Sequence, residues 1–234
     1  MRSIKNSSVL RKKAHVVAAV HSAGALRCAL KIRPGEVDFL EIRVDNFADD
    51  PSALRPVLPR LRVPLIVTVR HPAEGGAHSL GFPLRRELFA RFLPHAALID
   101  VELRSFEKLS ATIAAARRAG VKVIASAHYF HSTPTTANLR RAIRRAHAAG
   151  ADVCKLAALA DTPAALARLL GVFDQEAPLP LSIMGMGRFG KISRLLLAQA
   201  GSILNYGYLD RPNASGQWEA RVLKARLAEL ADAL

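Results

Sequence analysis

Residues Val121 to His128 read Val-Lys-Val-Ile-Ala-Ser-Ala-His, and residues Asp152 to Leu159 read Asp-Val-Cys-Lys-Leu-Ala-Ala-Leu. Between these two β-rich runs lies a segment of helical period. It has a candidate N-cap at Thr135 or Thr136 and ends at Gly150. A short apolar run, a helix and a second short apolar run together indicate a βαβ unit, in which the two strands lie parallel in one sheet.

The same alternation occurs eight times along the chain. Runs such as residues 64–70, Pro-Leu-Ile-Val-Thr-Val-Arg, are apolar on both faces, which suits a parallel sheet covered by helices. Eight units with no leftover domain predict an α/β fold, a single (β/α)8 TIM barrel over residues 15–234, preceded by a basic arm over residues 1–14. The strands are predicted at His15 to His21, Val37 to Val44, Pro64 to Arg70, Ala97 to Leu103, Val121 to His128, Asp152 to Leu159, Leu179 to Met186 and Ser202 to Tyr208.

An open, doubly wound sheet is the alternative for strands that alternate with helices. Such sheets usually carry a glycine-rich phosphate-binding turn after the first strand. Residues 21–26, His-Ser-Ala-Gly-Ala-Leu, do not have that pattern. The barrel is therefore the favoured architecture.

Three further helices have recognisable boundaries. Ser105 is predicted to cap a helix that runs toward Gly120, and Asp161 to cap one with Pro163 near its start. The segment from Trp218 to Leu234 is predicted to close the fold as an amphipathic helix.

The composition fits one self-sufficient domain. Of 234 residues, 50% are hydrophobic and 23% are charged, which leaves enough apolar surface for a large core. The two cysteines, Cys28 and Cys154, form neither a disulfide framework nor a zinc-ligand spacing, so we expect a cytoplasmic location. No apolar run reaches the length of a membrane span, and no signal peptide is recognised.

The net charge of +15 and the sequence pI of about 10.8 are also typical of proteins that bind nucleic acid. The basic residues are scattered along helical segments, however, and no series of aromatic residues runs between them to stack on bases. A solvated basic surface or an anionic substrate explains the charge as well. Nucleic-acid binding is therefore not expected.

Charged residues stand where the predicted strands end, which is the side of a barrel where active sites lie. A buried charge is costly unless it is paired, so charges from five strands at one end predict one polar pocket. Glu41, Arg43 and Asp45 stand at every second position and are therefore expected on one face of their strand. For Asp45 or Asp100 taken alone, a salt bridge that closes the barrel rim is the favoured interpretation. The candidates are Glu41, Arg43, Asp45, Arg70, Glu74, Asp100, Glu102, His128 and Lys155.

Lys155 is the least ordinary of these residues. It lies inside the run Val153-Cys154-Lys155-Leu156-Ala157, where no helical surface lets its ammonium reach water. Desolvation beside arginines is expected to favour the uncharged amine, which can attack a carbonyl group.

These motifs together resemble the type I 3-dehydroquinate dehydratases of the shikimate pathway, over the region from Val37 to Gln217. Each motif alone is weak, but seven in the correct order are hard to obtain by chance. They are Glu41-Ile-Arg43-Val-Asp45, Thr68-Val-Arg70 with Glu74-Gly-Gly, Ile99-Asp-Val-Glu102, Ser126-Ala-His128-Tyr-Phe130 with Thr133-Pro134, Ala151-Asp-Val-Cys-Lys155, Ser193-Arg194 and Gly216-Gln217.

The resemblance implies a hydro-lyase that converts 3-dehydroquinate to 3-dehydroshikimate through a Schiff base, in the biosynthesis of chorismate and the aromatic amino acids. It implies no metal or organic cofactor, a small-molecule substrate and a homodimer. The implied catalytic residues are Lys155, which forms the imine, His128, which transfers protons, and Glu74, which orients His128 with Asp100 or Glu102 as further support. The implied substrate-binding residues are Glu41, Arg43, Arg70, Arg194, Gln217, Met184 and Met186, with Arg194 on the carboxylate and Gln217 on a closing loop.

The sequence also departs from the family pattern. Tyr129 stands where an aspartate usually follows the catalytic histidine, and Asn213-Ala-Ser215 stands where the closing loop usually has Ser-Ala-Pro. The segment Met186-Gly-Arg188-Phe-Gly-Lys191 is unusually basic. These changes bear on the tuning of His128 and on selectivity, but they remove no group that the reaction needs.

Two alternatives come from different classes. Another imine-forming, aldolase-like barrel would keep Lys155 but has no need of Glu41, Arg43 and Arg194 together. A catalytically inactive basic barrel that binds nucleic acid would show steeply salt-dependent binding to DNA or RNA.

Overall fold

Eight strands lie side by side in one parallel sheet in the computed structural model, which describes residues 13–231. Their order is β7-β6-β5-β4-β3-β2-β1-β8, and each neighbouring pair is parallel. The strands are β1 (His15–Val20), β2 (Phe39–Arg43), β3 (Leu65–Thr68), β4 (Leu98–Glu102), β5 (Lys122–Tyr129), β6 (Val153–Leu159), β7 (Leu181–Met186) and β8 (Leu204–Tyr208).

The two end strands, β7 and β8, meet and nearly close the ring. The backbone N–H of Ile203 donates to the carbonyl of Leu181 at 2.8 Å, and Ser182 Oγ donates to the carbonyl of Leu204 at 2.7 Å. The predicted (β/α)8 barrel is confirmed, and every predicted strand is present with bounds shifted by at most two residues.

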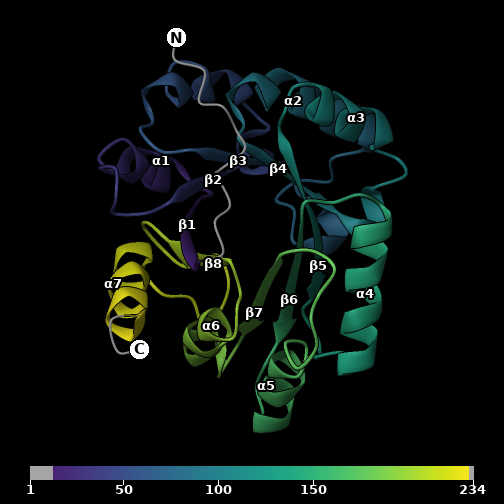
Figure 1. Cartoon of the computed structure of the whole chain (residues 1–234). Helices are drawn as coiled ribbons and strands as arrows, with labels where there is room; N and C mark the ends of the chain where they lie inside the picture. Colours follow the sequence, from purple (N-terminus) through teal and green to yellow (C-terminus); the bar gives the residue numbers. More distant parts are fainter. Residues whose placement is uncertain (1–12, 232–234) are drawn as a thin grey trace.

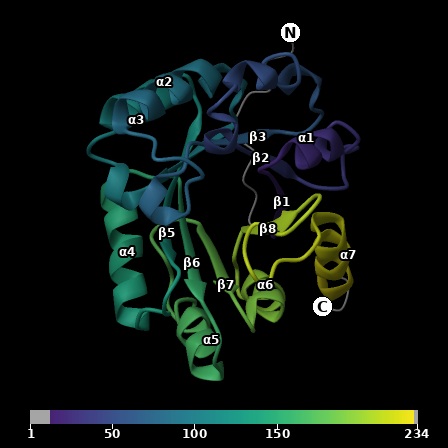
Figure 2. The same cartoon turned by 180° about the vertical axis from the view of Figure 1, so that it is seen from behind.

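The helices lie outside the strands (Figures 1 and 2). In Figure 1 the last helix, α7, lies beside β1 and β8, so it covers the junction between the first and the last strand. The helices are α1 (Ala23–Ala29), α2 (Phe82–Phe92), α3 (Ser110–Arg118), α4 (Thr136–Ala148), α5 (Pro163–Leu170), α6 (Gly190–Gln199) and α7 (Ala220–Ala231).

The connection between β2 and β3 contains no α-helix. Three 3-10 turns replace it, η2 (Val44–Phe47), η3 (Pro51–Leu54) and η4 (Leu58–Arg60). Pro51, Pro56 and Pro59 lie in this segment, and proline in a helix interior removes a backbone donor and clashes with the preceding turn.

Two of the predicted helix starts are wrong. Ser105 lies in the 3-10 turn η7 (Leu103–Ser105), and α3 begins only at Ser110. Helix α5 is capped by Thr162, whose side chain accepts from the N–H of Ala165, rather than by Asp161. Of the two candidates for α4, the cap is Thr135. Thr162 and Thr135 each stand directly before their helix, where the hydroxyl accepts from the N–H three residues on, whereas α3 has no side-chain cap.

The closing helix begins at Ala220, two residues after its predicted start, and residues 232–234 of that prediction lie outside the described residues. The predicted arm lies almost entirely outside them too, because only residues 13 and 14 of it are described. Within residues 13–231, none of the helices has both the length and the apolar character needed to cross a bilayer.

The side chains that point into the barrel change from apolar to polar over two residues of each strand. Side chains two apart on a strand share a face, so each strand contributes to successive interior layers. The lower layer is Phe39, Ile66, Leu98, Ile124, Val153 and Leu204. Two residues further toward the carboxyl ends, the side chains are Glu41, Thr68, Asp100, Ser126, Lys155 and Tyr206, all buried.

Candidate active site

A cavity opens above this polar layer, at the carboxyl ends of the strands. All ten residues to which the sequence analysis gave a catalytic or substrate-binding role line it. Its complete lining is Ala19, Glu41, Arg43, Arg70, Glu74, Gly75, His128, Phe130, Lys155, Ala157, Met184, Met186, Arg194, Tyr206, Asn213, Ala214 and Gln217.

Lys155 stands on the floor of this cavity and is 4% exposed. Its Nζ donates to Asp100 Oδ2 at 2.8 Å and to Glu41 Oε1 at 3.3 Å. The same Nζ lies 3.8 Å from the ring centroid of Tyr206, which is cation–π distance. The expected arginine neighbours are thus not its direct partners, because two carboxylates and an aromatic face surround the amine.

Arg70 links Lys155 to the rest of the charged layer. Its guanidinium lies 2.9 Å from Asp100 Oδ2 and 3.0 Å from Glu102 Oε1, and it also donates to Ser126 Oγ at 2.7 Å. Arg70 is 2% exposed, and the two carboxylates raise its pKa although burial opposes this. Ordered ion pairs therefore compensate the burial of these charges.

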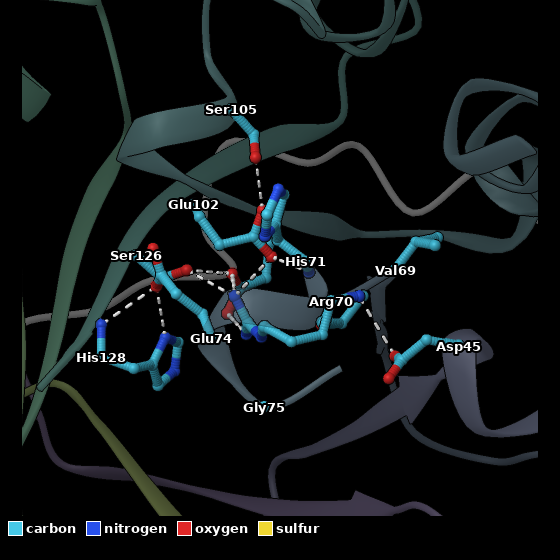
Figure 3. Close-up of polar contacts among 12 residues, drawn as sticks. Asp45, Val69, Arg70, His71, Glu74, Gly75, Glu102, Ser105, Ser126 and His128 are labelled. Carbon is cyan, nitrogen blue, oxygen red and sulfur yellow. Dashed lines mark hydrogen bonds and ion pairs between the residues drawn. The ribbon is translucent and has the colours of Figure 1, made fainter. Parts of the chain in front are cut away.

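His128 faces Glu74 at the side of the cavity (Figure 3). Glu74 Oε2 lies 2.9 Å from His128 Nδ1 and accepts from the His128 backbone N–H at 3.0 Å. Among residues 13–231 no side chain or backbone group hydrogen-bonds the opposite ring nitrogen, Nε2. The imidazole ring stacks on Phe130 with 6.1 Å between centroids. The Glu74 contact fixes the orientation of the imidazole.

His128 and Glu74 both have shifted pKa values. Burial lowers the pKa of His128 well below its ordinary value, and the positive charges of Arg70 and Lys155 act in the same direction. Burial, with a contribution from Glu102, raises the pKa of Glu74 to about 7. When Glu74 is ionised it accepts the Nδ1 proton of His128, so the neutral imidazole presents a basic Nε2 to the cavity.

Arg194 lies at the start of the second turn of α6 and is 1% exposed. It donates only to backbone carbonyls: Nε to Tyr206 at 2.9 Å, and Nη1 to Gly185, Gly190 and Gly216 at 2.8 Å each. Among residues 13–231 no carboxylate forms an ion pair with it, and burial lowers its pKa to about 10. Its orientation is fixed by neutral groups, and its charge is left for a ligand.

Gln217 organises the loop that borders the cavity beside Arg194. Its Oε1 accepts from the backbone N–H groups of Asn213 and Ala214, at 2.9 and 3.3 Å. Gly216 in the same loop has φ +72° and packs against Gly190 so closely that a Cβ on Gly190 would lie 2.7 Å from Gly216 Cα. Because both contact atoms are backbone, only glycine at position 190 allows this approach.

The remaining predicted residues have clear positions. Arg43 is held by Asp45 at 2.7 Å and by the carbonyl of Gly75 at 2.8 Å, so it bridges two loops at the cavity edge. Met184 and Met186 on β7 line the apolar side of the cavity.

Two roles considered for acidic residues differ from their observed contacts. Asp45 does not continue the strand face of Glu41 and Arg43, because β2 ends at Arg43 and Asp45 lies in η2. It accepts from the backbone N–H of Arg70 instead. Neither Asp100 nor Glu102 hydrogen-bonds His128, since both carboxylates are engaged by Arg70.

Sequence reasoning missed Tyr206 and Arg85. Tyr206 was detectable, since it occupies an inward position of β8, two residues beyond the buried Leu204. Arg85 gave no signal, because the adjacent Arg86 on α2 has the same chemistry and is exposed, whereas Arg85 is fully buried.

Comparisons with known proteins agree with this geometry. A sequence model of the family described as Type I 3-dehydroquinase matches residues 16–232. A 3-dehydroquinate dehydratase from Hydrogenobaculum sp. is 34% identical over 191 residues, 80% of this chain and 85% of the relative. A 3-dehydroquinate dehydratase from Methanothrix thermoacetophila is 30% identical over 93% of both chains.

Solved structures give the same result. A type I 3-dehydroquinate dehydratase from Clostridium difficile, in a crystal structure with covalently modified comenic acid, superposes with a TM-score of 0.87. The sequence identity is 26%, and the match covers 100% of this chain and 98% of the other. The 3-dehydroquinate dehydratase from Geobacillus kaustophilus gives a TM-score of 0.85 at 27% identity, covering 94% of this chain and 92% of the other.

Proposed function

Because the chain belongs to the type I 3-dehydroquinase family of hydro-lyases, we propose that it removes water from 3-dehydroquinate through a Schiff base on Lys155. The product is 3-dehydroshikimate. In the cell this step would serve the biosynthesis of chorismate and the aromatic amino acids.

The observation that carries the proposal is that one cavity contains both the buried guanidinium of Arg194, which has no carboxylate partner among residues 13–231, and the buried amine of Lys155. Arg194 has no carboxylate partner among residues 13–231, so an anionic ligand would gain the full benefit of its charge. Its planar donor group suits a carboxylate, which can accept two parallel hydrogen bonds. The substrate carries one carboxylate and one ketone, which match Arg194 and Lys155.

Lys155 supplies the covalent chemistry. His128 takes a proton from the Lys155 ammonium, and the freed amine attacks the ring ketone. The resulting carbinolamine takes this proton back and loses water to give a protonated imine. The imine withdraws electrons from the neighbouring methylene carbon and thereby acidifies its protons. Asp100 and Glu41, which contact Nζ in the free protein, stabilise the positive charge that the imine retains.

His128 moves the protons of the elimination. Its Nε2 accepts a proton from the activated carbon, and the electron pair passes into the imine to form an enamine. The enamine then expels the hydroxyl group at the β carbon, which leaves as water with the proton returned by His128. Hydrolysis of the conjugated imine releases the product and restores the Lys155 amine.

The other cavity residues bind and orient the ring. Glu41, Arg43 and Arg70 are proposed to bind the ring hydroxyls, and Met184 and Met186 its apolar face. Gln217 lies on a loop whose backbone also contacts Arg194 through Gly216, so closure of this loop over the substrate would couple to carboxylate binding.

The direct experiment mixes the purified protein with 3-dehydroquinate and follows the ultraviolet absorbance of the conjugated enone product. Borohydride is then added during turnover to reduce the imine, and the modified residue is mapped by mass spectrometry. We expect product formation and a substrate-derived adduct on Lys155. Absence of product under any condition in which the protein is folded would contradict the proposed reaction.

The same experiment distinguishes the dehydratase from the aldolase-like alternative by the fate of the substrate. An aldolase would form an imine on Lys155 but would cleave or form a carbon–carbon bond, so 3-dehydroquinate would be recovered without loss of water. The homodimer and the lack of nucleic-acid binding remain predictions, which sedimentation and salt-dependent binding to DNA or RNA would measure.

A further inference from the structure

Arg85 is a fully buried arginine behind the active site, on helix α2. It does not line the cavity. Its Nε and Nη2 both donate to the carbonyl of Val69, at 3.0 and 2.8 Å. Its Nη2 also donates to Glu102 Oε2 at 2.6 Å, and Nη1 donates to Ser105 Oγ at 3.0 Å. An arginine with this many ordered partners in a dry site fixes the position of each of them.

Arg85 begins a chain of alternating charges that ends at the catalytic amine. Glu102 lies between Arg85 and Arg70, at 2.6 and 3.0 Å. Arg70 in turn contacts Asp100 at 2.9 Å, and Asp100 contacts Lys155 Nζ at 2.8 Å. All five side chains are at most 5% exposed. Removal of Arg85 would leave Glu102 with one cationic partner where it now has two.

Arg85 and Glu102 also hold the loop that carries Glu74. Glu102, His71 and Glu74 are labelled in Figure 3. Arg85 donates to the carbonyl of Val69, at the start of this loop. Two residues further on, the backbone N–H of His71 donates to Glu102 Oε1 at 2.9 Å. The carbonyl of His71 accepts from the N–H of Glu74 at 2.9 Å. Hydrogen bonds therefore link Arg85 and Glu102 to Val69 and His71, and His71 to Glu74, the carboxylate that orients His128.

We propose that Arg85 is a positioning residue for the dehydration, acting through Glu102 on the Glu74 loop and on the Arg70–Asp100–Lys155 series. This inference rests on the proposed function for its kinetic consequence. Arg85 touches neither substrate nor reacting atoms, so it sets the geometry of the proton-transfer and imine-forming groups. Binding of the substrate carboxylate, which uses Arg194 on the opposite side of the barrel, does not depend on it.

The electrostatics support the same assignment. Glu102 is one of the groups that raise the pKa of Glu74, and Arg70 is one that lowers it. Loss of the Arg85 charge leaves more of the negative charge of Glu102 uncompensated. The pKa of Glu74 should then rise further, and the pH at which activity appears should rise with it.

The test compares Arg85→Met with Arg86→Met, two changes at neighbouring positions of α2. Arg86 is exposed, and among residues 13–231 its hydrogen bond is a 3.3 Å contact with the carbonyl of Lys108. For Arg85→Met we expect a fall in kcat of roughly ten- to a hundredfold, the scale of a small misplacement of catalytic groups, with KM changed less than threefold. The acid limb of the pH profile should move to higher pH. Arg86→Met should match the wild type in all three measurements.

A second variant keeps the proposal testable if Arg85→Met does not fold. Ser105 Oγ accepts from Arg85 and donates to Glu102 Oε2 at 2.9 Å, so Ser105→Ala removes one partner of each at small cost in packing. It should lower kcat in the same direction by a smaller factor. If folded Arg85→Met or Ser105→Ala protein keeps wild-type kcat and pH profile and is merely less heat-stable, Arg85 is structural and the inference is overturned.

A readout without substrate separates this inference from the proposed function. The NMR titration of the His128 ring and hydrogen exchange of the amides of residues 71–77 both report on the Glu74 loop. We expect Arg85→Met, but not Arg86→Met, to change the titration and to speed exchange. If the wild type fails to dehydrate 3-dehydroquinate yet these changes occur, the proposed function is wrong and the positioning role stands; unchanged spectra overturn the positioning role.

Discussion

Lys155 Nζ lies 2.8 Å from Asp100 Oδ2, although the backbone register places Glu102, not Asp100, level with Lys155 across β4, β5 and β6. Glu102 is unavailable because Arg85, Ser105 and the N–H of His71 hold it on the far side of Arg70. The amine therefore pairs with Asp100, which lies two residues nearer the start of β4 than Glu102 and has the shorter side chain. This pairing holds the Lys155 amine on the cavity floor.

Lys155→Ala should abolish both turnover and borohydride labelling, because Lys155 is the one lysine among residues 13–231 that lines the cavity. The measurement is the mass of the reduced adduct together with the rate of enone formation. Lys191→Ala is the matched control, since Lys191 lies on α6 with its ammonium 5.1 Å from the Trp218 ring and does not line the cavity. Labelling that maps to Lys191 or another lysine would refute the proposed mechanism.

His128→Ala should lower kcat by about a hundredfold or more, the usual scale for loss of a general acid/base. The imine can still form on Lys155, so borohydride trapping should survive with slower formation and release. Single-turnover kinetics with trapping at timed intervals would show the intermediate accumulating. A near-normal kcat would instead make Tyr129, the next residue along β5, the candidate proton-transfer group.

Arg194→Lys should act on binding. The ammonium keeps the charge but cannot reproduce the guanidinium's four backbone contacts and its donors toward a carboxylate. We expect a higher KM and a fall in kcat/KM of on the order of ten- to a hundredfold, with trapping retained at saturating substrate. Complete loss of labelling at saturation would show that Arg194 is needed for imine formation itself.

The pH profile should show an acid limb near pH 7. The pKa of Glu74 is raised to about 7 by burial and Glu102, and only ionised Glu74 holds His128 in the tautomer with a basic Nε2. As the pH falls through this value the carboxyl takes up a proton, so kcat/KM should decrease roughly tenfold per pH unit. Glu74→Gln should lower the maximum and remove this limb. An unchanged limb in Glu74→Gln would assign the titration to another group.

Gly190→Ala should raise KM by roughly ten- to a hundredfold with the barrel intact. A displacement of the substrate-binding loop by about 1 Å weakens its contacts with the substrate by about this factor. The new Cβ would meet backbone atoms of Gly216 at 2.7 Å, so the loop that carries Gln217 must move. Gly81→Ala is the control, since its Cβ would meet only Pro83 Cδ at 3.6 Å. Equal KM values for the two variants would mean that the loop does not contribute to binding.

The sequence by itself determined the barrel and the charged residues of its cavity. The strands were predictable because burial on both faces gives each one a short apolar run, and a βα alternation leaves few ways to arrange them. The cavity residues were predictable because charged side chains such as Glu41 and Lys155 interrupt those runs at the strand ends. Local pattern is enough for this, since each signal lies within a few residues of chain.

Only the tertiary structure decided which of these charges are paired. Asp100 and Lys155 are 55 positions apart in the sequence. Asp100 pairs with the amine because Arg85 and Ser105, outside the strands, hold the carboxylate of Glu102. Arg85 and Arg86 are equivalent in sequence, and the packing of α2 alone buries one and exposes the other. Arg194 likewise has backbone carbonyls, and no carboxylate from residues 13–231, as its hydrogen-bond partners. Coulomb energies depend on distance and burial in three dimensions, and neither is written in the local sequence pattern.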